Sequence, residues 1–288
     1  MVYVHYIAAD PIANDRAYPY FTWIFISADR NTAETCFRIL QENKGRSLTV
    51  PMGPSQTVQT LTPKGIYRMS PKFWVLQIAE NSDCISNLAG AASLNPVPGT
   101  GQKDPAFAPL AGRMLCYWMG PYAALGNKPL AQLFDGHEYD RLSGYSFFIR
   151  QCGYPNTYWY CDGERIYLST TRRSRFTVSI ADRNTDTVRD ASSNTPLIES
   201  DHITISWSDR GNRKRIGLDD NYGLIPNADD YKVFSYLDFA GRFSLTDTAI
   251  PDPGHDGSTT VQALCWLGRR SSQEAFELCY GFYPEDDR

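Results

Sequence analysis

Three short segments of this chain combine aromatic side chains with Asp, Asn or Gly residues. Sugars are commonly bound by an aromatic face that stacks on C–H edges, while carboxylate, amide and backbone groups hydrogen-bond the hydroxyls. The sequence therefore predicts a carbohydrate-binding site, with a glycan or glycoprotein as the partner. The candidate residues are Trp207, Asp209 and Asn212 in the first segment, Asp219, Asn221 and Tyr222 in the second, and Trp159 and Asp162 in the third. The alternative is that both Trp residues belong to core strands and the polar residues only form turns.

A few residues could instead serve as catalytic groups of an enzyme. Cys161 or Cys84 could form a nucleophilic pair with His202 or His255, because such partners need not be close in sequence. Carboxylates of the kind that cleave glycosides also occur, at Asp135, Glu138 and Asp140. The alternative to a binding protein is thus a hydrolase or toxin-like enzyme with a cysteine or carboxylate site.

Metal and cofactor signatures are absent from the sequence. Asp219, Asp220 and Asn221 offer clustered oxygen ligands but lack the spacing of a calcium loop. The four histidines stand far apart, and His137-Glu138 is not followed by the second histidine of a zinc motif. There is no Walker loop, Gly-x-Gly-x-x-Gly or Gly-x-Ser-x-Gly. We therefore expect neither a metal site nor a cofactor.

The charge distribution argues against a global field for polyanions, since the formal net charge is −4. Nucleic acid is accordingly not an expected partner. Residues 165–215 nevertheless carry ten Lys or Arg and six Asp or Glu, a local charge of +4. This basic region could meet an anionic partner or form a solvated face of a sheet.

The chain start, MVYVHYIAAD, lacks the basic and apolar regions of a secretory signal. The most apolar stretch, residues 21–28, is too short to span a bilayer. These features predict a cytoplasmic or leaderless-secreted protein. The odd number of cysteines, seven, predicts buried free thiols rather than a disulfide framework. Bridges between Cys152 and Cys161 and between Cys265 and Cys279 are the alternative.

Alternating apolar runs around polar turns predict a strand-rich fold with helix below about 15%. The expected hairpins are residues 36–50, 73–88, 165–182, 202–218 and 261–282. Residues 89–140 read as an Ala/Gly/Pro-rich connection with a short helix at 128–134. We therefore expect two β-rich domains, 1–140 and 141–288. Ala-Asp-Arg-Asn-Thr at 28–32 recurs at 181–185, which suggests a duplication or simply good turn chemistry.

The hairpin pattern, with strands such as residues 165–169, resembles the β-trefoil lectin superfamily of ricin-B-like and fungal fruiting-body lectins. The Gln-x-Trp signature of the ricin-B group is absent. The resemblance implies an all-β fold of tandem β-trefoil-like domains and a role in recognising foreign glycans or in defence. We favour a lectin without enzymatic activity. A β-sandwich or jelly roll gives much the same pattern. A protein-binding inhibitor or structural β protein is a further alternative for the function.

Overall fold

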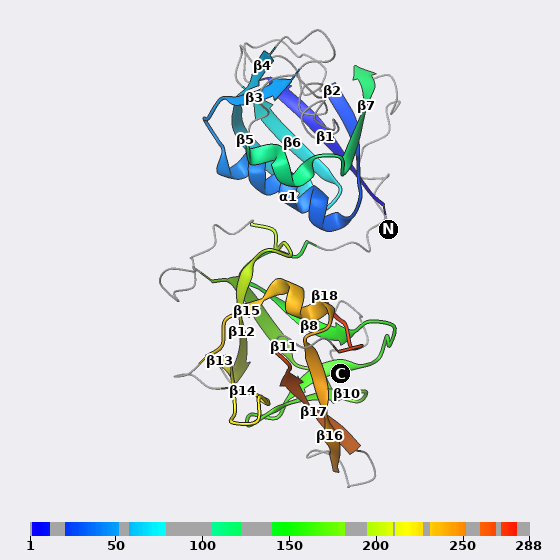
Figure 1. Cartoon of the computed structure of the whole chain (residues 1–288), viewed down its shortest axis with the longest axis vertical. Helices are drawn as coiled ribbons and strands as arrows, with labels where there is room; N and C mark the ends of the chain where they lie inside the picture. Colours follow the sequence, from blue (N-terminus) through cyan, green and yellow to red (C-terminus); the bar gives the residue numbers. More distant parts are fainter. Residues whose placement is uncertain are drawn as a thin grey trace. The chain divides into compact units, whose positions relative to one another are not determined.

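The computed structural model describes residues 2–11, 21–51, 58–78, 105–121, 140–181, 195–209, 211–226, 231–251, 260–268 and 272–280. The chain folds into two compact units, Met1–Asp140 and Arg141–Arg288, called unit 1 and unit 2 below (Figure 1). Strands dominate both units, and α1 is the one α-helix in the part of the chain that the structure describes. The prediction of a β-rich fold is confirmed. None of the described helices is long and apolar enough to cross a membrane.

Unit 1 is built on a five-stranded sheet with the order β5-β6-β1-β2-β7. Strands β1 and β6 are parallel and the other neighbours are antiparallel. A separate pair, β3–β4, is antiparallel. The elements are β1 (Tyr3–Pro11), β2 (Phe21–Ser27), α1 (Arg30–Glu42), β3 (Leu48–Pro51), β4 (Val58–Leu61), β5 (Pro63–Ser70), β6 (Phe73–Ile78), η1 (Pro105–Leu110) and β7 (Met114–Pro121).

Helix α1 replaces the first arm of the hairpin predicted at residues 36–50, so that prediction is wrong. Ala33, Cys36, Phe37 and Leu40 follow helical spacing and are all buried. Asp29 caps the helix by accepting hydrogen bonds from the Thr32 backbone and hydroxyl at 2.7 and 2.8 Å. The helix ends at Glu42, and a turn over residues 43–45 follows it.

The long connection predicted at residues 89–140 is also partly wrong, because η1 and β7 lie within it. Strand β7 pairs with β2 as an edge of the sheet, a contact between distant segments that local composition does not show. The short helix predicted at 128–134 falls outside the described residues.

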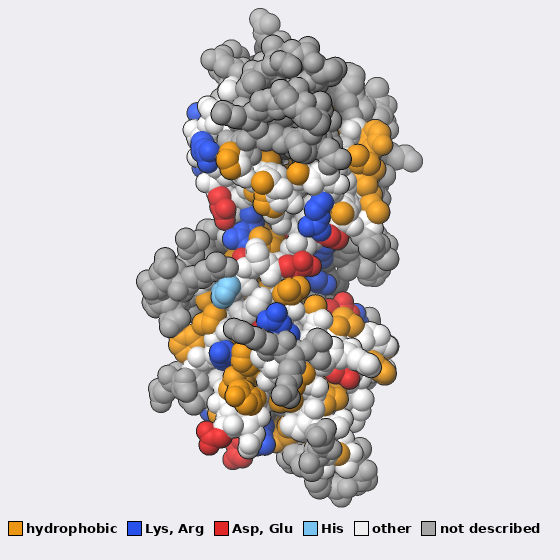
Figure 2. All heavy atoms as spheres, in the orientation of Figure 1, with side chains coloured by type: hydrophobic (Ala, Val, Ile, Leu, Met, Phe, Trp, Pro, Cys, Tyr) orange, Lys and Arg blue, Asp and Glu red, His pale blue; other side chains and the backbone are white. Residues whose placement is uncertain are grey.

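The two faces of the unit 1 sheet differ. The inner face buries Ile7, Trp23, Phe25, Trp74 and Leu76, and these residues form one hydrophobic cluster with residues of α1. The outer face is also apolar but largely solvent-exposed. The register places Val4 opposite Ile26, Ile26 opposite Leu115, and Ile24 opposite both Tyr6 and Tyr117. Hydrophobic side chains are visible along the edge that carries β7 (Figure 2), where Leu115 and Tyr117 are 52% and 55% exposed.

Unit 2 holds an eleven-stranded sheet among its described residues. The main order is β14-β13-β12-β11-β8-β9-β10-β17-β16, with β15 on β12 and β18 on β8. The elements are β8 (Tyr145–Gln151), β9 (Tyr158–Cys161), β10 (Ile166–Ser169), β11 (Arg175–Ile180), β12 (His202–Asp209), β13 (Asn212–Leu218), β14 (Leu224–Pro226), β15 (Phe234–Ser235), η3 (Tyr236–Ala240), β16 (Phe243–Pro251), β17 (Thr260–Trp266) and β18 (Phe276–Cys279).

The hairpin predicted at residues 202–218 is confirmed as β12–β13, with Gly211 at φ 90° in its turn. The hairpins at 165–182 and 261–282 are wrong in their pairing, although their strands exist. Strand β10 pairs with β9 and β17, β11 with β8 and β12, and β18 with β8. In the segment 73–88, β6 forms the first arm and the second arm lies outside the described residues.

The interior of unit 2 is aromatic. The Trp159 ring lies 5.0–5.9 Å from the rings of Phe176, Phe239, Phe243 and Phe276. This cluster fixes the inner face of the sheet. The described strand order of unit 1, with a parallel central pair and a helix on one face, does not reproduce the repeated hairpins expected of a trefoil.

Candidate functional site

The structure divides the predicted sugar-binding residues among three places. Asp162, Asp219, Asn221 and Tyr222 lie in loops that meet. Trp207, Asp209 and Asn212 lie at the β12–β13 turn, at the other end of the seven-residue strand β13. An extended strand of that length spans about 20 Å.

Trp159 is not a binding residue in this arrangement. Its side chain is fully buried, in the centre of the aromatic interior. Burying a large aromatic ring stabilises the fold, and here this removes the ring face from any ligand. The prediction that Trp159 contacts a sugar is therefore wrong, and the alternative of a core strand residue holds.

Two loops form what we call the binding-loop cluster, residues 162–165 and 219–223. Asp162 Oδ1 accepts hydrogen bonds from the backbone N–H groups of Glu164 and Arg165 at 2.8 and 2.9 Å. Arg165 Nη2 then donates to Asp219 Oδ2 at 3.0 Å, across 54 positions of sequence. Arg165 thus joins the two loops.

The second loop is closed by Asp219 itself. Its Oδ1 accepts hydrogen bonds from the backbone N–H groups of Asn221 and Gly223 at 2.9 and 2.8 Å. A side chain at Gly223 would meet the Asp219 carboxylate at 2.8 Å, so glycine is required by this close approach. The loop is also fastened to β17, because the Trp266 N–H donates to the Tyr222 carbonyl at 2.9 Å.

Tyr222 is the unusual residue of the binding-loop cluster. Its φ of 62° is the one left-handed non-glycine backbone among the described residues, and its side chain is 60% exposed. This conformation costs a β-carbon-bearing residue about 1–2 kcal/mol. Hydrogen bonds on both sides hold it, since the Tyr222 N–H also donates to the Asp219 carbonyl at 3.0 Å. The fold therefore fixes the backbone of an exposed aromatic residue in the loop that Asp219 closes.

A buried tyrosine lies beneath the first loop. Burial and then the charge of Asp162 raise the pKa of Tyr167 to about 12, and Asp162 also hydrogen-bonds it. The Tyr167 hydroxyl consequently stays protonated at neutral pH. Asp162 is thus held from two sides, by backbone donors and by this side chain.

The β12–β13 turn is arranged differently. Trp207 is half-buried and packs against the aromatic interior, with the Lys214 ammonium 5.9 Å from its ring centroid. Asp209 pairs with Asn212 across the turn, and Asn212 is exposed. Sugar contacts by Trp207, Asp209 and Asn212 remain a prediction.

Comparison with known proteins adds little to this geometry. No family model and no curated protein matches the chain. Among solved structures, the chain is similar to a mutant of HCR/D at a TM-score of 0.27 and 11% identity. The match covers 90% of this chain, which spans about 65% of the length of the HCR/D chain. A likeness at this TM-score does not define a shared fold.

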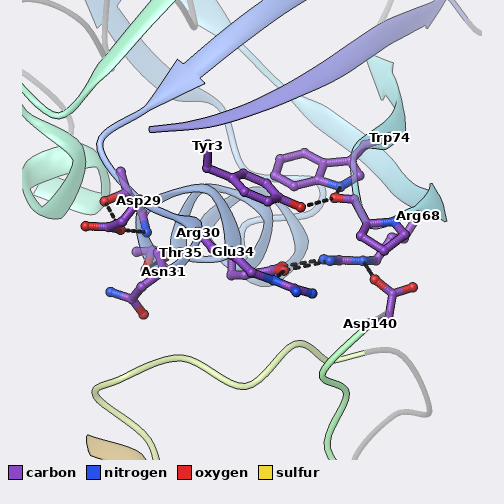
Figure 3. Close-up of polar contacts among 11 residues, drawn as sticks. Tyr3, Asp29, Arg30, Asn31, Glu34, Thr35, Arg68, Trp74 and Asp140 are labelled. Atoms are coloured by element: carbon purple, nitrogen blue, oxygen red, sulfur yellow. Dashed lines mark hydrogen bonds and ion pairs between the residues drawn. The ribbon is translucent and has the colours of Figure 1, made fainter. Parts of the chain in front are cut away.

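A second polar cluster, in unit 1, was not anticipated from the sequence. Arg68 donates from Nη1 and Nη2 to the two carboxylate oxygens of Glu34, the latter at 2.6 Å, and from Nε to Asp140. Figure 3 shows the guanidinium between these two carboxylates. The side chains of Arg68 and Glu34 are only 3% and 4% exposed. The guanidinium also lies 5.4 and 5.8 Å from the ring centroids of Phe37 and Trp74.

The electrostatics of this Arg68 cluster follow from its burial and its ion pairs. Burial raises the pKa of Asp140, although the charge of Arg68 opposes the shift. The pKa of Arg68 lies above its ordinary value because the attraction of Glu34 and Asp140 outweighs the effect of burial. Asp140, one of the carboxylates considered for glycoside cleavage, is therefore held in an ion pair. Asp135 and Glu138 lie outside the described residues.

Each cysteine with a shifted pKa has it raised, so none of these thiols is activated as a nucleophile. Burial raises the pKa of Cys36 to about 12 and also raises the pKa of Cys152 and Cys279. A raised pKa disfavours the reactive thiolate. Cys161 is buried in the interior of unit 2, and the six described cysteines are free thiols. Within the described residues, no group of His, Cys, Asp or Glu side chains could hold a metal ion.

Proposed function

We propose that unit 2 binds carbohydrate through the binding-loop cluster, in the manner of a lectin. The observation that carries the proposal is Tyr222, an exposed aromatic residue held in a left-handed conformation in the loop that the Asp219 carboxylate closes. Residues in sparsely populated backbone conformations concentrate at ligand-binding sites, because the surrounding structure must maintain them.

Each group in the cluster has a role in this proposal. The Tyr222 ring stacks on the C–H face of a sugar, because the electron-rich face of the ring attracts the slightly positive C–H hydrogens. Asn221 is exposed and supplies both a donor and an acceptor. The Asp219 and Asp162 carboxylates accept hydrogen bonds from sugar hydroxyls, and Arg165, with a side chain 51% exposed, donates to ring or hydroxyl oxygens.

A glycan array with the intact protein, followed by titration of the best ligand, tests this function. The decisive variant is Tyr222→Asn, because asparagine tolerates the left-handed region well. We expect affinity to fall about tenfold or more, since loss of a stacked aromatic ring costs on the order of 1 kcal/mol beyond its buried area. The free energy of unfolding should stay constant or rise slightly.

Tyr154→Asn is the matched control, because Tyr154 is also 60% exposed but lies in the turn after β8. It should leave glycan affinity unchanged. Arg165→Ala removes the ion pair that joins the two loops. As a single variant it should weaken glycan binding, as Tyr222→Asn does. If no glycan on the array binds, or if Tyr222→Asn and Tyr154→Asn behave alike, the binding-loop cluster is not a carbohydrate site.

The β12–β13 turn is proposed as a second contact region for the same class of ligand. Asn212→Ala would weaken glycan binding if this turn contributes, and would leave it unchanged if the turn is only structural. Because Asn212 is exposed, the free energy of unfolding should change by only about 0.5 kcal/mol.

A further inference from the structure

The face of the unit 2 sheet that lies away from the aromatic interior carries a row of hydroxyl groups that ends in an arginine. Strand register places Ser146 opposite Thr177, Thr177 opposite Ser206, and Ser206 opposite Arg215. The next row along the strands pairs Ser179 with Thr204. Residues opposite each other in antiparallel strands share a face, so these groups all lie on the side away from the aromatic interior.

Two arginines of β13, Arg213 and Arg215, reach over this face. Arg213 Nη2 donates to Ser179 Oγ at 3.3 Å, and the Arg215 guanidinium stacks 4.2 Å from the centroid of the Tyr231 ring. Burial and then the charge of Arg215 lower the pKa of Arg213, so the two cations are close enough to repel. No described carboxylate forms an ion pair with either of them.

Two hydroxyls on the same face lack partners. Thr204 Oγ1 and Ser206 Oγ are buried and make no hydrogen bond in the described part of the chain, and their residues are 0% and 1% exposed. A buried hydroxyl without a partner is unfavourable, as is a pair of adjacent cations without a counter-ion. One ligand that accepts hydrogen bonds and carries negative charge would relieve both conditions.

We propose that Arg213 and Arg215, with Ser206 and Thr204, bind a tetrahedral oxyanion: the sulfate or phosphate ester of a small molecule. Arginine forks match the paired oxygens of such groups, and the hydroxyls donate to the remaining ones. A carboxylate offers two acceptor oxygens in one plane, whereas a sulfate or phosphate ester presents three non-bridging oxygens in different directions. This oxyanion site lies on the sheet face rather than at the loops, so its failure and the failure of the binding-loop cluster can be told apart.

The test uses three probes that share one sugar: glucose 6-sulfate, glucose 6-phosphate and glucose itself. Each is titrated into the intact protein by calorimetry at constant ionic strength, because salt screens exposed charges. We expect saturable binding of at least one ester and no binding of glucose at this site. The relative affinities of the two esters then identify which oxyanion the site prefers.

Lys214 provides a matched control for the arginines. Lys214 lies between them on β13 but shares its face with Trp207. Arg213→Gln and Arg215→Gln should each weaken ester binding by about tenfold or more, whereas Lys214→Gln, which removes the same charge, should change it less than about twofold. Arg213→Lys guards against misfolding, and it should retain weak binding because it keeps the charge but loses the fork.

Ser206→Ala distinguishes a binding role from a structural one. Removing a hydroxyl that has no partner should leave the melting temperature constant or raise it, while ester affinity falls several-fold. The proposal is overturned if neither ester binds saturably. It is equally overturned if Lys214→Gln weakens binding as much as Arg213→Gln, since net charge rather than a built site would then explain the affinity.

Discussion

The two units place polarity on opposite sides of their sheets. Unit 1 encloses charged and titratable groups, namely His5, Glu34 and Arg68, and leaves apolar residues such as Leu115 and Tyr117 on its outer face. Unit 2 encloses an aromatic cluster around Trp159 and places Ser, Thr and Arg side chains on the opposite face of its sheet. Alternation of side chains along a strand assigns each residue to one of two sheet faces. The two units show that alternation alone does not determine which face carries the polar groups.

The difference has a physical cause in each unit. In unit 1, the buried charges are tolerated because Arg68 is paired with two carboxylates and stacked on aromatic rings. In unit 2, the buried Asp238 is likewise paired, with Arg242 at 3.3 Å, whereas Arg213 and Arg215 lie on the sheet face away from the aromatic interior. A variant that removes a buried charge should therefore affect unit 1 far more than any surface charge affects unit 2.

Arg68→Met should produce the largest effect. Among the described residues it leaves the buried Glu34 carboxylate with Arg30 as its ion-pair partner, at 3.2 Å, and breaking one side of a buried ion pair costs about 3–5 kcal/mol. Urea denaturation would measure the loss, and amide hydrogen exchange would locate it in α1 and β5, which carry Glu34 and Arg68. The double variant Arg68→Met with Glu34→Leu should recover most of the loss.

Arg113→Met is the exposed counterpart, because the Arg113 and Asp29 side chains are 46% and 40% exposed. Its cost should be below about 1 kcal/mol. Equal losses for Arg68→Met and Arg113→Met would contradict the view that burial of the charge sets the size of the effect.

His5 makes the stability of unit 1 depend on pH. Burial, and then the charge of Arg68, lowers the pKa of His5 to about 3, and the ring is held between Trp74 and Phe25 at centroid distances of 4.2 and 5.4 Å. The unfolded chain takes up this proton below pH 6.5, the ordinary histidine value. The folded state therefore loses stability as pH falls from about 6.5 towards 3, by about 2–3 kcal/mol at pH 4.5.

His5→Phe removes this linkage and keeps an aromatic ring in place. The difference in unfolding free energy between the variant and the wild type should grow in favour of the variant as pH falls through that range, and should be constant above about pH 7.5. Parallel stability curves for the two proteins from pH 8 to pH 4.5 would show that His5 is not buried in the neutral form.

Leu115→Ser should produce the smallest effect. Leu115 is 52% exposed on the outer face of unit 1, so the free energy of unfolding should change by about 0.5 kcal/mol or less. Leu76→Ala, on the fully buried inner face, is the matched control and should cost about 2–5 kcal/mol. A loss above 2 kcal/mol for Leu115→Ser would mean that the outer face is covered.

Local sequence patterns predicted those parts of the fold that depend on neighbouring residues. The alternation of Ile203, Ile205 and Trp207 and the glycine turn at Gly211 are local, and the hairpin they predict is present. At residues 36–50 the spacing of Cys36, Phe37 and Leu40 also satisfies a helix, and packing on the sheet decided between the two. The partners of β10, β11, β17 and β18 lie far along the chain, so no local signal specifies them.

The candidate site shows the same division. The loop chemistry of Asp162, Asp219 and Tyr222 was visible in the sequence, but the ion pair that joins the loops spans 54 positions. Trp159 was indistinguishable from a binding aromatic because burial is a property of the assembled sheet. The ion pairs of Arg68 with Glu34 and Asp140, across 34 and 72 positions, had no signal at all beyond residue type.

The pairing of β8 with β18 bears on how unit 2 is synthesised. Phe276 to Cys279 align with Gln151 to Phe148, and Arg150 and Glu277 meet at 2.7 Å across 127 positions. On a ribosome, β8 emerges first and keeps one edge open while the intervening strands are translated. Such an edge invites pairing with other nascent chains, and closing so long a loop is slow. We therefore expect unit 2 to complete its sheet only after β18 has left the exit tunnel.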